Sequence, residues 1–290
     1  MRSVSLNDEC RLSGLQNCMA EGCCGIGVGG HLGDMLDELL YLGLVEDEEI
    51  LLDEAALTLA ALDHPELDED PFWEVLSDIG EGLIKFEAAQ DPAVQGDHLA
   101  RVLAGRFRFT GERETYDDPA NADMMSVIER RRGLPVSLSI LYVSAARRLG
   151  WMASALDVPG HVLVMIGGLN NSVVIDPFNN GALVSPEHFA ARLGVSPTLH
   201  SAVVKDGVGM TNRAVLLRLL RNQAVRAKGA GANDRALELL RRMTVLAPSC
   251  SQVWWECAEL EMAVGYHGAA RESLVSMLEV TRDPDVRNRI

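Results

Sequence analysis

The sequence lacks an apolar run long enough to cross a membrane. Its longest runs, Ile50–Leu52 and Ala55–Leu62, end at acidic residues well short of the roughly 20 residues that a membrane-spanning helix needs. The first residues carry Glu9, Arg11 and Glu21 among other polar groups, so they contain no apolar signal-peptide core. We therefore expect a soluble, cytoplasmic protein without a membrane partner.

Basic residues are scarce over a large part of the chain. Residues 34–97 contain 20 acidic residues and one basic residue, Lys85, whereas the rest of the chain carries 22 acidic and 25 basic residues. The net charge of the whole chain is −16. Because an acidic surface repels phosphate backbones, we expect no nucleic-acid partner.

Cysteine is absent between positions 25 and 249, so the six cysteines form two groups. Cys10, Cys18, Cys23 and Cys24 lie near the start, and Cys250 and Cys257 lie near the end. The first group and His31 include metal-ligating residue types, but their C-x7-C-x4-C-C spacing lacks the C-x2-C pairs typical of zinc sites. We expect reduced thiols, no metal and no cofactor.

The chain divides into four segments by pattern. Residues 1–33, which include a glycine-rich stretch without periodicity, are expected to be a flexible leader. Over 34–95, apolar residues recur at steps of three and four, which predicts an acidic layer of short amphipathic helices. Residues 96–200 predict a mixed helix and strand core, and residues 210–285 predict pairs of helices.

The middle segment has the pattern of an α+β fold. A helix is predicted over 134–149, because Pro135 suits a first turn, Arg147 and Arg148 suit the last turn, and Gly150 provides a stop. Three strands are predicted over 153–158, 162–166 and 172–175, separated by turn-forming residues. A helix packed on a small antiparallel sheet is the expected core.

The last segment repeats itself with a period of 34 residues. Four pairs share this offset: Ala224 and Ala258, Gly231 and Gly265, Ala236 and Ala270, and Leu240 and Leu274. This period is typical of tetratricopeptide repeats, in which small residues let two helices approach closely. The sequence predicts about two such repeats.

Two residues of the middle segment are candidates for chemistry. His161 opens one predicted strand and Asp176 ends another, so pairing of the strands would bring both side chains to the same end of the sheet. A carboxylate beside an imidazole fixes its tautomer and raises its basicity, as in the base and orienter of a catalytic triad. Structural roles, in a strand for His161 and as a turn cap for Asp176, are the alternative.

Four stretches together resemble a known family. They are residues 116–121 (YDDPAN), 129–142 (ERRRGLPVSLSILY), 159–164 (PGHVLV) and 175–181 (IDPFNNG). In this order they resemble the SirB-type branch of the transglutaminase-like superfamily, over roughly residues 46–283. The resemblance implies a papain-like α+β core in which a helix precedes the sheet that carries His161 and Asp176.

The nucleophile of that superfamily is missing. Active members place a cysteine at the start of the helix, where the helix dipole and a neighbouring histidine activate the thiol. Here that position falls at Pro135, followed by Val136 and Ser137. We therefore expect a degenerate, non-catalytic protein that binds a protein partner through its repeats and its vestigial cleft. The alternative is a hydrolase or acyl transferase that uses Ser137, His161 and Asp176.

Overall fold

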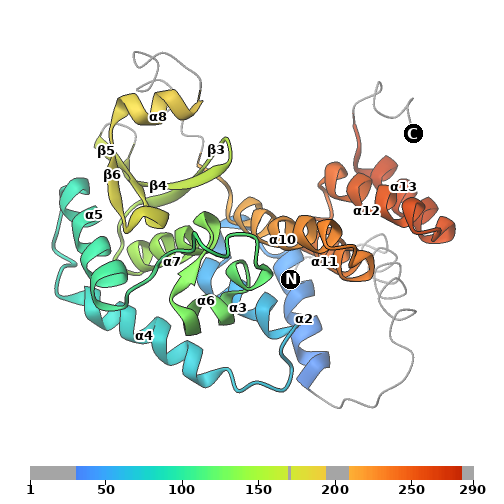
Figure 1. Cartoon of the computed structure of the whole chain (residues 1–290), viewed down its shortest axis with the longest axis horizontal. Helices are drawn as coiled ribbons and strands as arrows, with labels where there is room; N and C mark the ends of the chain where they lie inside the picture. The colour runs from blue at the N-terminus through green and yellow to red at the C-terminus, as the bar shows by residue number, and fades with distance from the viewer. Residues whose placement is uncertain (1–30, 169–170, 194–208, 283–290) are drawn as a thin grey trace, which may run out of the picture. The chain divides into compact units, whose positions relative to one another are not determined.

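The computed structural model describes residues 31–168, 171–193 and 209–282 (Figure 1). The predictions for residues 1–30 of the leader and for its four cysteines therefore lie outside the described residues. Residues 31–33, which the sequence pattern assigned to the leader, begin helix α2 (His31–Leu44). The chain separates into two compact units. The larger unit is Leu44–Ala236, and the described part of the smaller unit is 31–43 with 237–282.

The larger unit is built from helices around a small sheet. Its α-helices are α3 (Leu52–Ala61), α4 (Asp70–Ile84), α5 (Pro92–Ala100), α6 (Met124–Arg130), α7 (Pro135–Arg148), α8 (Pro186–Leu193) and α10 (Asn212–Gly229). Four shorter helical segments connect them: η1 (Asp47–Glu49), η2 (Arg101–Arg106), η3 (Pro119–Asn121) and η4 (Pro177–Asn179). The mixed helix and sheet content is that of the predicted α+β class.

The sheet is antiparallel, with its strands in chain order. It consists of β3 (Ala153–Val158), β4 (His161–Gly168), β5 (Asn171–Asp176) and β6 (Ala182–Val184). The first three correspond to the predicted strands, and Val158 pairs with His161 across the Pro159-Gly160 turn. Strand β6 was missed, because a three-residue strand directly after Gly181 is too short to show an alternating pattern.

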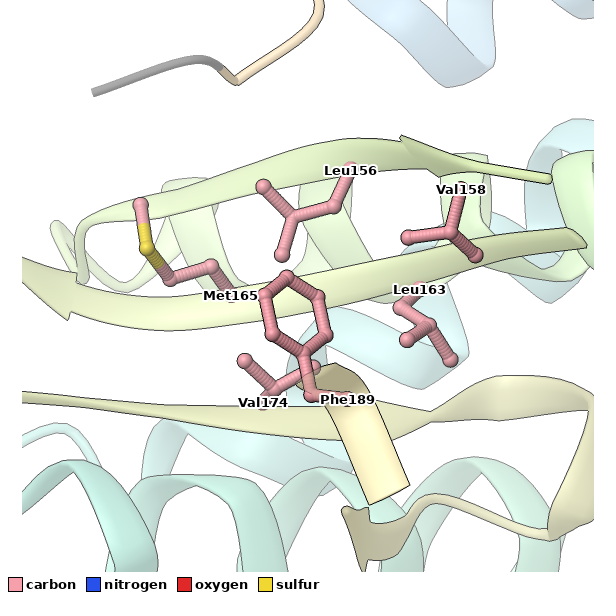
Figure 2. Packing of buried hydrophobic residues seen from close by; sticks show 6 residues of the cluster. All are labelled: Leu156, Val158, Leu163, Met165, Val174 and Phe189. Carbon is pink, nitrogen blue, oxygen red and sulfur yellow. The ribbon is translucent and has the colours of Figure 1, made fainter. Parts of the chain in front are cut away.

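Both faces of the sheet are covered by helices (Figure 1). Helix α7 packs against β3 and β4, and every residue from Pro135 to Ala146 is buried. On the other face, Phe189 of α8 packs among Leu156, Leu163 and Val174 (Figure 2). The predicted helix over 134–149 is therefore the central helix of the unit. Because it is buried on all sides, it carries no charged residue before Arg147.

The acidic helices are joined to this core through paired charges. The backbone N–H of Asp53, at the start of α3, donates to Ser144 Oγ at 3.1 Å. The buried Asp53 carboxylate pairs with Arg148 in the last turn of α7. A buried carboxylate needs such a partner, since an unpaired charge in this position would be strongly destabilising.

Two short parallel strands, which the sequence pattern did not predict, pair beside the start of α7. Strands β1 (Thr110–Gly111) and β2 (Arg132–Gly133) pair over two residues each. They hold the segment after η2 next to the segment that leads into α7. A two-residue strand carries no periodic signal, so only the folded chain reveals this pairing.

The smaller unit contains helices only in its described part. They are α2 (His31–Leu44), most of α11 (Asn233–Leu246), α12 (Ser251–Ala263) and α13 (His267–Val280). Helices α12 and α13 pack against each other. Glu261 of α12 is buried and accepts hydrogen bonds from Ser273 Oγ at 2.8 Å and from Arg241 at 3.2 Å.

The two units have different boundaries from the predicted segments 34–95 and 210–285. Helix α2 belongs with the C-terminal helices, and α10 belongs with the mixed core. Gly43 of α2 gives a local reason, because a Cβ atom there would lie 2.2 Å from the carbonyl oxygen of Val245 in α11. Only a glycine permits this close backbone approach.

The 34-residue period is visible in the backbone of the helix ends. Gly231 follows α10 and Gly265 follows α12, and both adopt positive φ, at 76° and 87°. Left-handed glycines are common immediately after a helix, where they let the chain reverse. The period therefore relates the glycines that follow α10 and α12.

Candidate functional site

His161 and Asp176 are brought together by the register of two neighbouring strands. Val164 of β4 pairs with Ile175 of β5, so position 163 aligns with position 176. His161 lies two residues from position 163 and therefore on the same face. The result is a distance of 2.9 Å between His161 Nε2 and Asp176 Oδ1. The proximity expected from the sequence is present, whereas a catalytic role for the pair stays a prediction.

The Asp176 carboxylate is held by the local sequence as well as by His161. It caps η4, since Oδ1 accepts the backbone N–H groups of Phe178 at 3.1 Å and Asn179 at 3.3 Å. Oδ2 accepts the Asn179 side-chain amide at 2.6 Å. The cap role and the contact with His161 are thus two functions of one carboxylate.

These contacts set the charge of Asp176. Burial alone would raise the pKa of this carboxyl, which is 5% exposed. The hydrogen bond and charge of His161, followed by the hydrogen bonds from Asn179, more than offset the burial and lower the pKa. Asp176 is therefore a carboxylate at neutral pH.

The carboxylate in turn defines the chemistry of the imidazole. Asp176 can only accept a hydrogen bond, so Nε2 of His161 carries the proton of that contact. In the neutral imidazole, Nδ1 is then the nitrogen with the free electron pair. This is the arrangement of a general base and its orienting carboxylate.

At the start of α7, Ser137 is hydrogen-bonded to the main chain rather than to His161. Pro135 occupies the first turn, and Ser137 Oγ donates to the main-chain carbonyl oxygen of Asn121 at 2.8 Å. Ser137 is fully buried, and among the described residues it makes no hydrogen bond with His161. The structure thus brings His161 and Asp176 together, whereas the hydroxyl of Ser137, the third predicted residue, is bonded to Asn121.

An aromatic ring lies against the histidine. Phe178 meets His161 edge to face, with the ring centroids 5.8 Å apart, and it meets Tyr116 in the same way at 6.0 Å. Gly111 of β1 lies against Phe178, because a Cβ atom at position 111 would be 2.5 Å from the ring. The short β1–β2 pairing therefore positions the ring beside His161.

Sequence reasoning missed three residues that build this site. Asn179 connects Asp176 to Arg113, because its side-chain oxygen accepts from the Arg113 guanidinium while its amide donates to Asp176. Asn121 is buried, and its amide donates to the carbonyl oxygen of Thr115 at 2.6 Å. Asn121 and Asn179 lie within the YDDPAN and IDPFNNG stretches, which assigned no role to either residue, and no local pattern indicates Arg113.

Another buried polar group lies near Asp176. The hydroxyl of Tyr142 in α7 has no hydrogen-bond partner among the described residues, and a Cβ atom at position 181 would lie 3.0 Å from it. Burial, followed by the charge of Asp176, raises the pKa of this phenol. Tyr142 is therefore protonated throughout the physiological range and contributes a neutral group.

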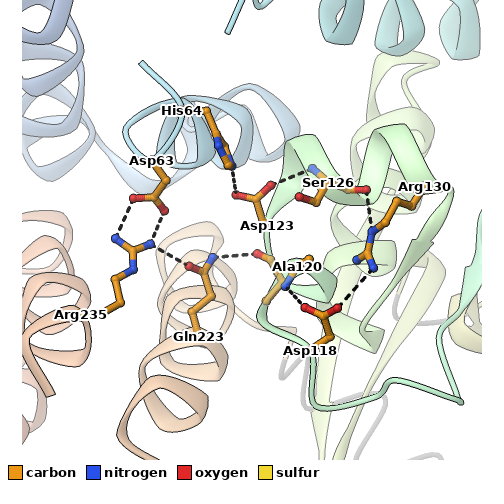
Figure 3. Close-up of polar contacts among 10 residues, drawn as sticks. Asp63, His64, Asp118, Ala120, Asp123, Ser126, Arg130, Gln223 and Arg235 are labelled. Carbon is orange, nitrogen blue, oxygen red and sulfur yellow. Dashed lines mark hydrogen bonds and ion pairs between the residues drawn. The ribbon is translucent and has the colours of Figure 1, made fainter. Parts of the chain in front are cut away.

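A second histidine–carboxylate pair in the larger unit connects the end of α3 to the start of α6 (Figure 3). His64, which follows α3, lies 3.1 Å from Asp123 Oδ2, while Asp123 Oδ1 caps α6 by accepting the N–H of Ser126 at 2.7 Å. Nearby, Arg235 pairs with Asp63, and Gln223 of α10 donates to the carbonyl oxygen of Ala122 at 2.9 Å. These contacts join the acidic helices, α6 and α10.

The two C-terminal cysteines differ in their surroundings. Cys257 is buried, and burial followed by the charge of Glu261 raises the pKa of its thiol to about 12. Cys250 is half-buried. Within the described ranges, no group of three or more His, Cys, Asp or Glu side chains could hold a metal ion. The described helices also include none that is long and apolar enough to cross a membrane.

The geometry defines a class of fold and site: a buried helix on a small antiparallel sheet that carries a hydrogen-bonded histidine and aspartate. Comparison with known families agrees, because the transglutaminase-like superfamily matches residues 71–221. This match covers just over half of the chain, so the chain belongs to the transglutaminase-like superfamily.

Individual relatives extend this comparison. A UPF0162 protein of Xylella fastidiosa is 28% identical over 258 residues, which are 85% of this chain and 91% of the relative. Human F-box only protein 21 is 29% identical over 153 residues, which are 50% of this chain and 23% of that protein. A crystal structure of menin, described as revealing the binding site for Mixed Lineage Leukemia (MLL) protein, aligns with a TM-score of 0.38 at 12% identity. It covers 86% of this chain and 69% of menin, and a TM-score this low does not bear on the fold.

Proposed function

We propose that this protein is a non-catalytic member of the transglutaminase-like superfamily, of the SirB-type branch, that binds a protein partner in the cytoplasm. The observation that carries the proposal is the contrast at one site. His161 and Asp176 form a complete base and orienter, while Pro135 stands where a nucleophile would be activated. A base without a nucleophile cannot form the covalent intermediate on which thiol acyl transfer depends.

The position of Pro135 matters physically. Unpaired N–H groups at a helix start stabilise a thiolate and lower the pKa of a cysteine placed there. Proline has no thiol, and its ring also removes one of those N–H groups. Cys257 does not replace it, because its thiol is almost entirely protonated at neutral pH.

The partner surface in this proposal is the pair of helix–turn–helix segments with a 34-residue period. We propose that α10 to α13 form two tetratricopeptide-like repeats, supported by the equivalent left-handed glycines Gly231 and Gly265. Met262 of α12, Tyr266 at the N-cap of α13 and Val275 of α13 are exposed at 43%, 48% and 48% of their area. Methionine and aromatic residues are enriched at the core of protein–protein interfaces.

One observation favours a second candidate, a hydrolase or acyl transferase that uses Ser137, His161 and Asp176. The histidine and the carboxylate keep the geometry of an active pair, with four donors fixing the carboxylate. Against it stands the hydrogen bond from Ser137 to Asn121, since a nucleophilic hydroxyl must pass its proton to the histidine.

Turnover assays distinguish the two candidates. Wild type, Ser137→Ala, His161→Ala and the control Ser139→Ala would be tested on a panel of ester, amide and glutamine substrates. The binding role predicts no turnover that depends on Ser137 or His161. Turnover that is lost in both variants and kept in Ser139→Ala, with unchanged melting temperatures, would establish the hydrolase instead.

Binding can be tested on the same full-length chain. Met262→Ser and Val275→Ser should reduce the capture of a partner from cell extract without lowering the melting temperature, because both side chains are exposed. Leu183→Ser is the matched control, since Leu183 is 61% exposed on β6. Equal capture by all three variants would contradict a role for α12 and α13.

A further inference from the structure

Arg113 is an exposed arginine whose guanidinium is held in a fixed orientation beside the His161–Asp176 pair. One nitrogen donates to the Asn179 side-chain oxygen, and the guanidinium carbon lies 5.0 Å from the centre of the Phe178 ring. Phe178 is the same ring that meets His161 edge to face. Asn179 cannot rotate freely, because its amide group donates to Asp176.

Among the described residues Arg113 makes no ion pair, whereas Arg130, Arg148 and Arg235 each pair with an aspartate. Its contacts are a neutral amide and an aromatic ring, so the positive charge remains available to a ligand.

The geometry of the guanidinium suits a planar anion. An arginine carries five N–H donors in a rigid plane, and the bond to Asn179 uses one of them. The remaining donors match the two oxygens of a carboxylate. Stacking on Phe178 and the bond to Asn179 also remove side-chain freedom before a ligand binds, which lowers the entropic cost of binding.

The surrounding charge favours a single negative charge over a double one. Residues 101–150 contain nine arginines and six acidic residues, in contrast to the strongly acidic stretch before them. The loop of Arg113 itself carries Glu112, Glu114, Asp117 and Asp118. These carboxylates would repel a phosphate dianion more strongly than a carboxylate monoanion.

We propose that Arg113 is the anion-binding residue of a ligand site beside His161 and Asp176, and that the site takes a carboxylate group. This inference rests on the proposed binding role, and it names the chemical class that the His161 site would recognise. The carboxylate could be a chain terminus or an acidic side chain, and both sources present the same group to the guanidinium.

Titration followed by NMR tests the proposal on the full-length chain. The probe is N-acetylglycine, with N-acetylglycinamide as its uncharged counterpart and inorganic phosphate as the alternative anion. The readout is the imidazole resonance of His161, assigned by its loss in His161→Gln. We expect a saturable shift with N-acetylglycine in the millimolar range and none with the amide.

Matched variants connect this shift to Arg113. Arg113→Met should weaken binding about tenfold or more, the usual loss for a hydrogen bond to a charged group. Arg113→Lys should weaken it less, because lysine keeps the charge without the planar donor pair. Arg132→Met is the control, since Arg132 is also exposed and lies on the paired strand β2, and it should change binding less than about twofold.

Several outcomes would overturn the proposal. They are the absence of a saturable shift, equal binding by Arg113→Met, an equal loss in Arg132→Met, and tighter binding of phosphate than of N-acetylglycine. N-acetylglutamate with its main-chain carboxylate amidated then distinguishes a side-chain carboxylate from a terminal one. A failed titration leaves the non-catalytic role standing, while turnover in the substrate assays would overturn that role and leave a measured carboxylate site in place.

Discussion

The hydroxyl of Ser137 donates a hydrogen bond to the main-chain carbonyl oxygen of Asn121, 2.8 Å away and 16 residues earlier in the chain. The same carbonyl accepts the backbone N–H of Leu134 at 3.0 Å. Asn121 therefore closes the start of α7, and Ser137 serves as part of that closure. In this structure the Ser137 hydroxyl is therefore bonded to the main chain at the start of α7 and not to His161.

Removing the Ser137 hydroxyl should reduce stability. Ser137→Ala is expected to lower the free energy of unfolding by about 1 kcal/mol, the usual net value of one buried hydrogen bond. The measurement is the urea midpoint at pH 7.

Ser139 provides the matched control for this change. It is equally buried on α7, and its Oγ has no hydrogen-bond partner among the described residues. Ser139→Ala should leave the midpoint unchanged or raise it, because burying an unpaired hydroxyl is itself unfavourable. An equal loss in both variants would show that the bond to Asn121 is not what stabilises this turn.

Asp176 should make the stability of the protein dependent on acidity. Its pKa is lowered in the folded chain, so its contribution is complete above the unfolded value of about 4 and is lost as the pH falls through the folded pKa. Asp176→Asn should therefore unfold more easily than wild type at pH 7, and the difference should shrink below about pH 4.

Urea midpoints of wild type and Asp176→Asn at pH 7, 5, 4 and 3.5 would check this dependence. Every other carboxylate titrates in both proteins, so the change in the difference below pH 5 reports on Asp176. A difference that stays constant down to pH 3.5 would mean that the charge of Asp176 contributes nothing to stability.

The packing of Gly111 on Phe178 predicts a strong effect for one added methyl group. A Cβ atom at position 111 would lie 2.5 Å from the ring, so Gly111→Ala must displace Phe178 from His161. We expect a loss of about 1–3 kcal/mol, as for other overpacked sites, and a changed His161 imidazole resonance.

Gly80 in the middle of α4 is the control for this substitution. A Cβ atom at position 80 would meet nothing within 4 Å. Gly80→Ala should stabilise the protein by up to about 1 kcal/mol, because alanine favours a helix over glycine. If Gly111→Ala proved as stable as wild type, the ring would have to lie elsewhere in solution.

The two C-terminal cysteines should react with iodoacetamide at different rates. The pKa of Cys257 is raised to about 12, first by burial and then by Glu261, so little thiolate is present at pH 8. Half-buried Cys250 should therefore be alkylated first in the folded chain. Peptide mass spectrometry over time would measure both rates, and urea should make them similar. Faster labelling of Cys257 in the folded chain would contradict its burial.

The sequence by itself determined the elements of the core and one part of the site. The apolar face and end signals around Pro135 and Gly150 predicted α7, and turn residues separated three of the four strands. His161 and Asp176 could be paired from sequence, because strand alternation and a short connection leave few possible registers. These are local properties, and the residues that decide them are close together in the chain.

Only the tertiary structure decided what surrounds that pair. Arg113 reaches Asn179 across 66 positions of sequence, and Ser137 finds Asn121 through the closure of α7. The grouping of α2 with the C-terminal helices also depends on a close backbone approach at Gly43. Such contacts join segments that are distant in the chain, and they depend on how whole elements pack. No periodicity or spacing in the sequence encodes them.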